Sequence, residues 1–154
     1  MKRRLFLKAS LATGEIALLA GAGLLTPLQA LASWPKDAFH ADSLSAAMSG
    51  LLGSGEITPS DQIEIDTNEI AENGSVVPIE VRSAIPDTRA ISLFASKNPF
   101  PALAEFTLTP DVDPLISCRI KLAETGEVIV VVAAGGKLYS AKRPVKVTAG
   151  GCGG

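Results

Sequence analysis

The stretch VIVVVAAGGKLYSAKRPVKV, residues 128–147, holds two β-prone runs separated by a pair of glycines. Residues 128–132 are apolar at both parities, the pattern of a central strand that is covered on both faces. Residues 145–148 alternate between valine and a polar residue, which leaves one face of the second strand in water. Pro144 predicts a bend in that strand. Because so short a turn joins the two runs, we expect them to pair in the antiparallel sense.

The same alternation of β-prone runs and turn residues begins at Gln62 and continues to the end of this stretch. We expect about seven strands, at residues 63–65, 76–82, 90–95, 104–109, 115–122, 128–134 and 138–147. Before them, apolar residues recur at helical spacing over residues 44–52, with Asp42 or Ser43 as N-cap and a stop near Gly53. The sequence therefore predicts an all-β, immunoglobulin-like antiparallel β-sandwich with a short N-terminal helix that lays one face on a core.

The amino terminus has the composition of an export signal. Residues 2–8 read KRRLFLK, and a modestly apolar stretch follows, which is typical of a twin-arginine signal. A general secretory signal that contains two arginines is the alternative. Cleavage after Ala32 would leave 122 residues, organised as one domain over residues 33–148 and a tail over residues 149–154. No later run reaches the length of a membrane helix, so we expect no membrane contact after cleavage.

Charge and composition narrow the function further. The chain has a formal net charge of −2, which becomes −5 without residues 1–32, so nucleic acid is not an expected partner. His40 is the only histidine, and two well-separated cysteines do not make a metal cluster. His40 is interpreted as a surface or half-buried helix residue rather than a general base. We expect no catalytic residues, no metal and no cofactor.

The tail carries the strongest functional signal, because Cys152 is flanked by Gly150, Gly151, Gly153 and Gly154. Glycine has no Cβ, so the backbone on both sides of the thiol is free to adopt almost any conformation. No bulky side chain stands near the sulfur. Such a flexible arm fits insertion of the cysteine into the active-site cleft of a partner protein.

Cys118 supplies the competing interpretation, since exported proteins often form disulfides. Its parity matches that of Ile116 and Ile120, so we expect its side chain to point into the core as a small, buried and inert hydrophobe. A Cys118–Cys152 bridge and an intermolecular disulfide through Cys152 remain alternatives. The intermolecular disulfide would fit a different class of protein, an exported structural or adhesive β-sandwich with a disulfide-forming tail.

Four segments resemble SoxY, the sulfur-carrier family of the bacterial thiosulfate-oxidising Sox system. They are IAENGSVVP at residues 70–78, KNPFP at 97–101, RIKLAET at 119–125, and residues 145–154 with their GGCGG ending. The resemblance implies a periplasmic carrier, not an enzyme, that holds sulfur intermediates on Cys152 as a cysteine S-thiosulfonate or a persulfide. It also implies a heterodimer with a SoxZ-like subunit. The implied enzymes are a thiosulfate-coupling haem enzyme, a sulfate-releasing hydrolase and a sulfane-oxidising enzyme.

The residues around Cys152 agree with a carrier that relies on other enzymes. No histidine or basic residue is near it in sequence to lower the thiol pKa, and a carboxylate two residues later would disfavour the thiolate. Reach matters more for such a tail. Residues 148–152 span roughly 13 to 16 Å when fully extended, at ~3.3 to 3.6 Å per residue.

Overall fold

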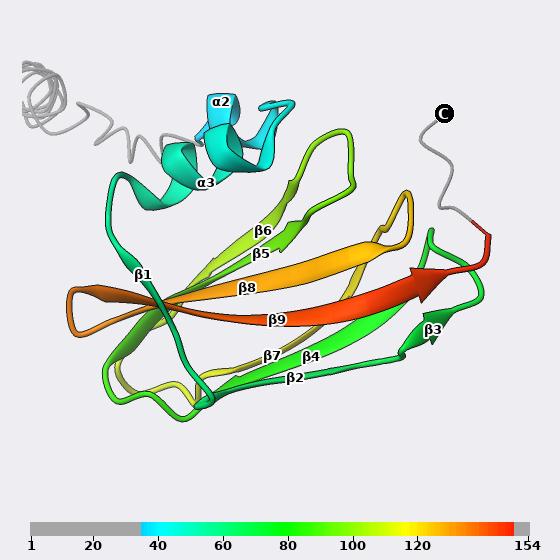
Figure 1. The fold of residues 1–154 in the computed structure, drawn as a ribbon. Helices are drawn as coiled ribbons and strands as arrows, with labels where there is room; N and C mark the ends of the chain where they lie inside the picture. Colours follow the sequence, from blue (N-terminus) through cyan, green and yellow to red (C-terminus); the bar gives the residue numbers. More distant parts are fainter. Residues whose placement is uncertain (1–34, 150–154) are drawn as a thin grey trace, which may run out of the picture. The chain divides into compact units, whose positions relative to one another are not determined.

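The computed structural model describes residues 35–149. The described part has two short helices followed by nine strands (Figure 1). The elements are α2 (Lys36–Phe39), α3 (Leu44–Leu52), β1 (Ile57–Pro59), β2 (Ile63–Thr67), β3 (Ile70–Ala71), β4 (Val77–Ser83), β5 (Thr88–Ala95), β6 (Ala102–Thr107), β7 (Leu115–Ile120), β8 (Gly126–Ala134) and β9 (Lys137–Val147). The predicted signal segment, residues 1–32, lies outside the described residues.

The strands form two sheets that face each other across a core (Figure 1). The larger sheet has the order β1-β9-β8-β5-β6, with β3 also paired to β9, and the smaller has the order β2-β4-β7. Alternate residues of facing strands fill the space between them, among them Leu93, Val130 and Val81, which are fully buried. This arrangement confirms the predicted β-sandwich, because each sheet turns its apolar parity inward.

Strand β8 is buried on both faces, as its apolar run predicts. Val130 points into the space between the sheets, while Ile129 and Val131 belong to a second apolar cluster on the outer face. Helix α3 covers this outer face and contributes Ala47, which has no exposed surface. Ser43 caps α3 by accepting a hydrogen bond from the backbone N of Ala46, at 3.3 Å. The predicted helix, with one face on a core, is therefore confirmed.

Two strands were not predicted, and both pair parallel to β9. Residues 57–59 run alongside the start of β9, and residues 70–71 alongside its end. Between them the chain crosses to the smaller sheet as β2, so all three segments run in the direction of β9 (Figure 1). Strands of two or three residues carry too little periodicity to be recognised, and their partner is far along the chain.

The turn between β8 and β9 has the geometry that its glycines indicate. Gly135 and Gly136 have φ values of 55° and 74°, which fit a tight hairpin with two left-handed residues. Pro144 lies opposite Glu127 with no shift of register, so the expected bend does not interrupt the pairing. Proline is tolerated there because neither β1 nor β3 pairs with this part of β9, which leaves its outer edge open.

Candidate functional site at the base of the C-terminal arm

Cys152 and its four flanking glycines lie outside the described residues. What the structure describes is the place from which this arm leaves the sandwich, at Thr148 and Ala149 just beyond β9. Cys152 is only three residues further along the chain than Ala149. The surroundings of Ala149 therefore decide where the thiol can be presented.

The end of β9 is held by hydrogen bonds on both of its edges. On one edge, the backbone N of Gly74 donates to the carbonyl O of Ala149 at 2.8 Å, and the N of Thr148 donates to the O of Ala71 at 3.0 Å. On the other, the N of Val147 donates to Oγ1 of Thr125 at 2.9 Å. The chain is thus fixed as far as Ala149, which gives the arm a defined starting point.

Two further loops support this anchor. The backbone N of Leu122 donates to the O of Gly74 at 2.8 Å, which joins the β7–β8 loop to the β3–β4 loop. Asn98, in the β5–β6 loop, donates through Nδ2 to the O of Lys121 at 2.7 Å and accepts from the N of Ala123 at 2.8 Å. Its side-chain amide therefore joins the third loop to the other two.

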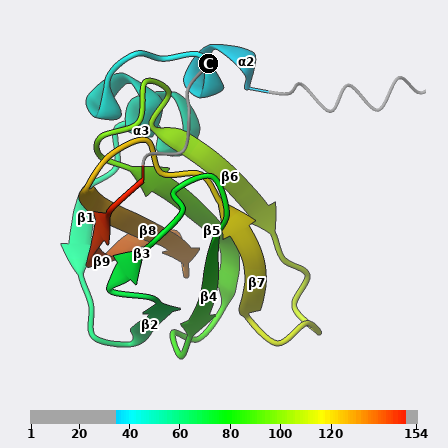
Figure 2. The ribbon, with the colours of Figure 1, turned by 90° about the vertical axis from the view of Figure 1, so that its right-hand side faces the viewer.

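We call these four segments the arm base: residues 69–76, 96–101, 121–127 and 146–149. They lie together at one end of the sandwich, which faces the viewer in Figure 2. The four sequence segments that resemble the SoxY family overlap the arm base. Residues far apart in the sequence that share this resemblance are thus neighbours around the start of the arm.

Replacing Asn98 with alanine is expected to weaken the arm base. The change removes two hydrogen bonds that join the β5–β6 and β7–β8 loops. We expect the free energy of unfolding to fall by about 1 to 3 kcal/mol in urea denaturation. The control is Asn68→Ala, at an exposed position outside this network, with an expected change within about 0.5 kcal/mol. Equal effects of the two changes would contradict the role given to Asn98.

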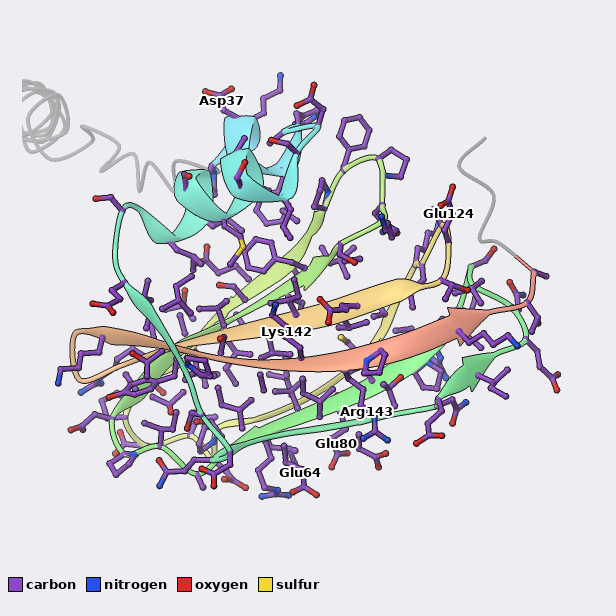
Figure 3. All side chains as sticks on the ribbon, in the orientation of Figure 1. Asp37, Glu64, Glu80, Glu124, Lys142 and Arg143 are labelled. Carbon is purple, nitrogen blue, oxygen red and sulfur yellow. The ribbon has the colours of Figure 1, made fainter. Side chains whose placement is uncertain are left out.

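Two ion pairs lie on the surface near the arm base. Nη2 of Arg143 lies 3.3 Å from Oε1 of Glu69. Nζ of Lys142 lies 3.7 Å from Oε2 of Glu127. All four side chains are substantially exposed, so each pair contributes little to stability. Figure 3 shows Lys142 and Arg143 on β9 and Glu124 near the end of the molecule where the arm begins. These two basic side chains therefore belong to the solvated surface of the strand.

Cys118 lies in β7, opposite Ile79 of β4, and packs against the core between the sheets. Its parity agrees with the prediction, since Ile116 and Ile120 are buried on the same side. Cys118 is less buried than predicted, because it lies half-buried in a strand at the edge of the smaller sheet. Burial raises the pKa of its thiol, which lowers the thiolate fraction at neutral pH.

Alkylation should distinguish the two cysteines. At pH 7.5 we expect iodoacetamide to label Cys152 first and Cys118 slowly, because the raised pKa and partial burial of Cys118 leave little accessible thiolate. The Cys118 rate should increase as the pH rises toward that pKa, and by roughly tenfold or more on unfolding in urea. Peptide mass mapping of the Cys152→Ser variant measures Cys118 alone. Equal Cys118 rates in native and unfolded protein would refute this account.

His40 is placed at the C-terminal end of α2, where it is exposed. Its Nδ1 lies 2.8 Å from the carbonyl O of Lys36, and its ring meets that of Phe100 edge-on, with centroids 6.1 Å apart. These contacts agree with a surface residue at a helix end. Within residues 35–149, no group of three His, Cys, Asp or Glu side chains is arranged to hold a metal ion. No helix in that range is long and apolar enough to cross a membrane.

Comparison with known proteins identifies the family. The model of the family described as "Sulfur oxidation protein SoxY" matches residues 48–152, a range that ends at the arm cysteine. The chain belongs to the SoxY family. It is also similar to the solved structure of the sulfur carrier protein SoxY from Chlorobium limicola f thiosulfatophilum, with 44% identity and a TM-score of 0.63. That match covers 69% of this chain and 96% of the other.

A second solved structure has a related fold. Superoxide reductase (neelaredoxin) from Ignicoccus hospitalis is 17% identical, with a TM-score of 0.53, and the match covers 59% of this chain and 94% of that one. At this identity the likeness concerns the fold alone. The search of curated protein sequences found no match. The SoxY fold and family thus confirm the resemblance seen in the sequence.

The sequence did not reveal how the arm base is held together. Asn73-Gly74 and the segment around Asn98 have the composition of turns, but nothing local marks them as partners of the end of β9 and of the β7–β8 loop. Thr125, directly before Gly126, likewise has only the local pattern of a turn. The available signal was indirect: the SoxY-like segments, scattered in sequence, are the ones that meet at this end of the sandwich.

Proposed function

We propose that this SoxY-family chain is a covalent carrier that holds sulfur intermediates on Cys152 during thiosulfate oxidation. The observation that carries the proposal is the family match that reaches Cys152, combined with an anchored strand end only three residues before it. The similar protein from Chlorobium limicola is named a sulfur carrier protein, which supports the same role here. Carriage, with catalysis left to separate enzymes, also agrees with the lack of an activating group next to Cys152 in the sequence.

The proposed cycle begins with oxidative coupling. The sulfane sulfur of thiosulfate bonds to Sγ of Cys152, the thiol loses its proton, and two electrons pass one at a time through the haem of a partner enzyme to an electron acceptor. The product is a cysteine S-thiosulfonate. Water then attacks the sulfonate sulfur, the bond to the sulfane sulfur breaks, and sulfate leaves while a persulfide remains on Cys152. A third enzyme oxidises and releases the remaining sulfur.

We also propose a compartment and partner proteins for this chain. Residues 1–32 would direct twin-arginine export to the periplasm, and a SoxZ-like subunit would form a heterodimer with this chain. A folded pair would suit a pathway that exports folded proteins. The visiting enzymes are the thiosulfate-coupling haem enzyme, the sulfate-releasing hydrolase and the sulfane-oxidising enzyme.

Thiosulfate labelled at one sulfur position tests the proposed cycle. The mature chain with its partner subunit is incubated with the haem enzyme and the hydrolase purified from the same host. Label in the sulfane position should remain on the chain and be released by reductant, whereas label in the sulfonate position should appear as free sulfate. Failure of both labels to pass through the chain would contradict the carrier role. Covalent dimers without label would instead support the structural or adhesive class.

A further inference from the structure

The short distance between Ala149 and Cys152 restricts any enzyme that acts on the cargo. Three residues span about 10 Å when fully extended, at ~3.3 to 3.6 Å per residue. The carbonyl O of Ala149 accepts a hydrogen bond from the backbone N of Gly74, so Ala149 is held in the arm base. An active site that receives the Cys152 thiol must therefore bring its entrance against the arm base.

The arm base also bears most of the large apolar side chains that the described part of the chain exposes. Four such residues are more than half exposed: Ile70 at 55%, Val76 at 53%, Phe100 at 54% and Val112 at 52%. The first three lie in the arm base, in β3, the β3–β4 loop and the β5–β6 loop. Val112 lies in the β6–β7 loop, at the opposite end of the strands. We call Ile70, Val76 and Phe100 the apolar rim.

None of the hydrogen bonds described above that join the arm base involves a side chain of the apolar rim. The bonds that join its loops come from Gly74, Asn98 and Thr125. Phe100 touches His40 with the edge of a ring and still leaves about half of its surface in water. Three of the four large apolar side chains that are more than half exposed in residues 35–149 thus lie on the segments around the start of the arm, where a partner's contact surface would be expected.

The loops that bear Phe100 and Val76 belong to one hydrogen-bonded end of the sandwich. The β5–β6 loop with Phe100, the β7–β8 loop and the β3–β4 loop with Val76 are joined in that order by hydrogen bonds (Figure 2). A typical interface covers about 800 Å² on each partner, which is roughly 30 Å across. We expect one protein seated over the arm base to cover the start of the arm and the loops that surround it.

We propose that the apolar rim is the docking surface for the enzymes that process the sulfur cargo, and that it fits an apolar border around their active-site entrances. The inference rests on the proposed carrier function. A second copy of this chain or a permanent subunit is a poorer occupant, because it would block the approach to a thiol that reaches only about 10 Å from Ala149. The contact is brief, since successive enzymes must share the same surface.

Steady-state kinetics of the loaded carrier with the sulfate-releasing hydrolase test this inference. The variants are Val76→Ser and Phe100→Ser, and the matched control is Val112→Ser, which makes the same change at an equally exposed position far from the arm. We expect KM for the carrier to rise roughly tenfold in each rim variant with kcat nearly unchanged, because the docking contact is lost while the chemistry at Cys152 stays. Val112→Ser should retain the wild-type KM.

The outcomes separate the rim from the carrier role. If all three variants carry and lose the label like the wild type and share its KM, the rim is not the docking surface and the carrier function stands. If the rim variants instead lose self-association or the partner subunit in sedimentation, with KM unchanged, another occupant covers the rim and the inference is wrong. If even the wild-type chain is never loaded, the proposed function fails and the rim proposal fails with it.

Discussion

Replacing Cys152 with serine is expected to abolish sulfur carriage. Serine cannot form the sulfur–sulfur bond that holds the S-thiosulfonate or the persulfide, so no intermediate has a place of attachment. In an assay reconstituted from the partner enzymes, thiosulfate-dependent electron transfer should fall to the rate measured without this chain. The fold should be unaffected, because position 152 lies beyond the last strand of the sandwich.

The matched control for this prediction is Cys118→Ala. Cys118 packs at the edge of the core and takes no part in the proposed cycle, so the variant should keep the wild-type rate. Stability should fall only modestly, because a half-buried thiol is replaced by a methyl group. Retained activity in Cys152→Ser, or loss of activity in Cys118→Ala, would transfer the functional role away from the arm.

The second large effect is expected from bulky residues beside the cysteine. In Gly150→Leu/Gly151→Leu, two branched side chains precede the thiol, so the arm is wider and its backbone is more restricted. We expect kcat/KM with each partner enzyme to fall by about 10- to 100-fold, equivalent to roughly 1.4 to 2.7 kcal/mol of transition-state stabilisation. The thiol itself should still react with a small maleimide at the wild-type rate.

A graded control separates width from chain flexibility. Gly150→Ala/Gly151→Ala adds only two methyl groups, so its loss should be much smaller than that of the leucine pair. An exported protein that is crosslinked by its tail would keep its covalent dimer in both variants. Unchanged sulfur turnover in the leucine variant would count against insertion of the arm into enzyme clefts.

The layers of the fold could be predicted because a buried strand has a recognisable pattern of apolar residues in its own sequence. The unbroken apolar run in β8 corresponds to a strand covered by the second sheet on one face and by α3 on the other. Strands β1 and β3 have no such pattern, since they are three and two residues long and depend on β9 for their pairing. Cys118 followed its predicted parity, but parity alone could not show that β7 is an edge strand with a partly open side.

The reactive group of the candidate site could be predicted from the sequence, but the hydrogen bonds that hold the arm base could not. A cysteine between glycine pairs is recognisable from the sequence alone, and it lies outside the described residues. The arm base depends instead on hydrogen bonds between distant residues, such as those that join Asn98 to Ala123 and Gly74 to Ala149. Turn motifs identified these loops individually, whereas their meeting at one end of the sandwich is a consequence of the strand order.

The carrier role is tested most directly by intact mass spectrometry, without reductant, of the mature chain purified from its native host during growth on thiosulfate. We expect sulfane or thiosulfonate adducts on the native chain that are lost on reduction and are absent from Cys152→Ser. A chain that carries no adduct during active thiosulfate oxidation and is lighter by two hydrogens would contradict it, because that mass indicates a Cys118–Cys152 disulfide.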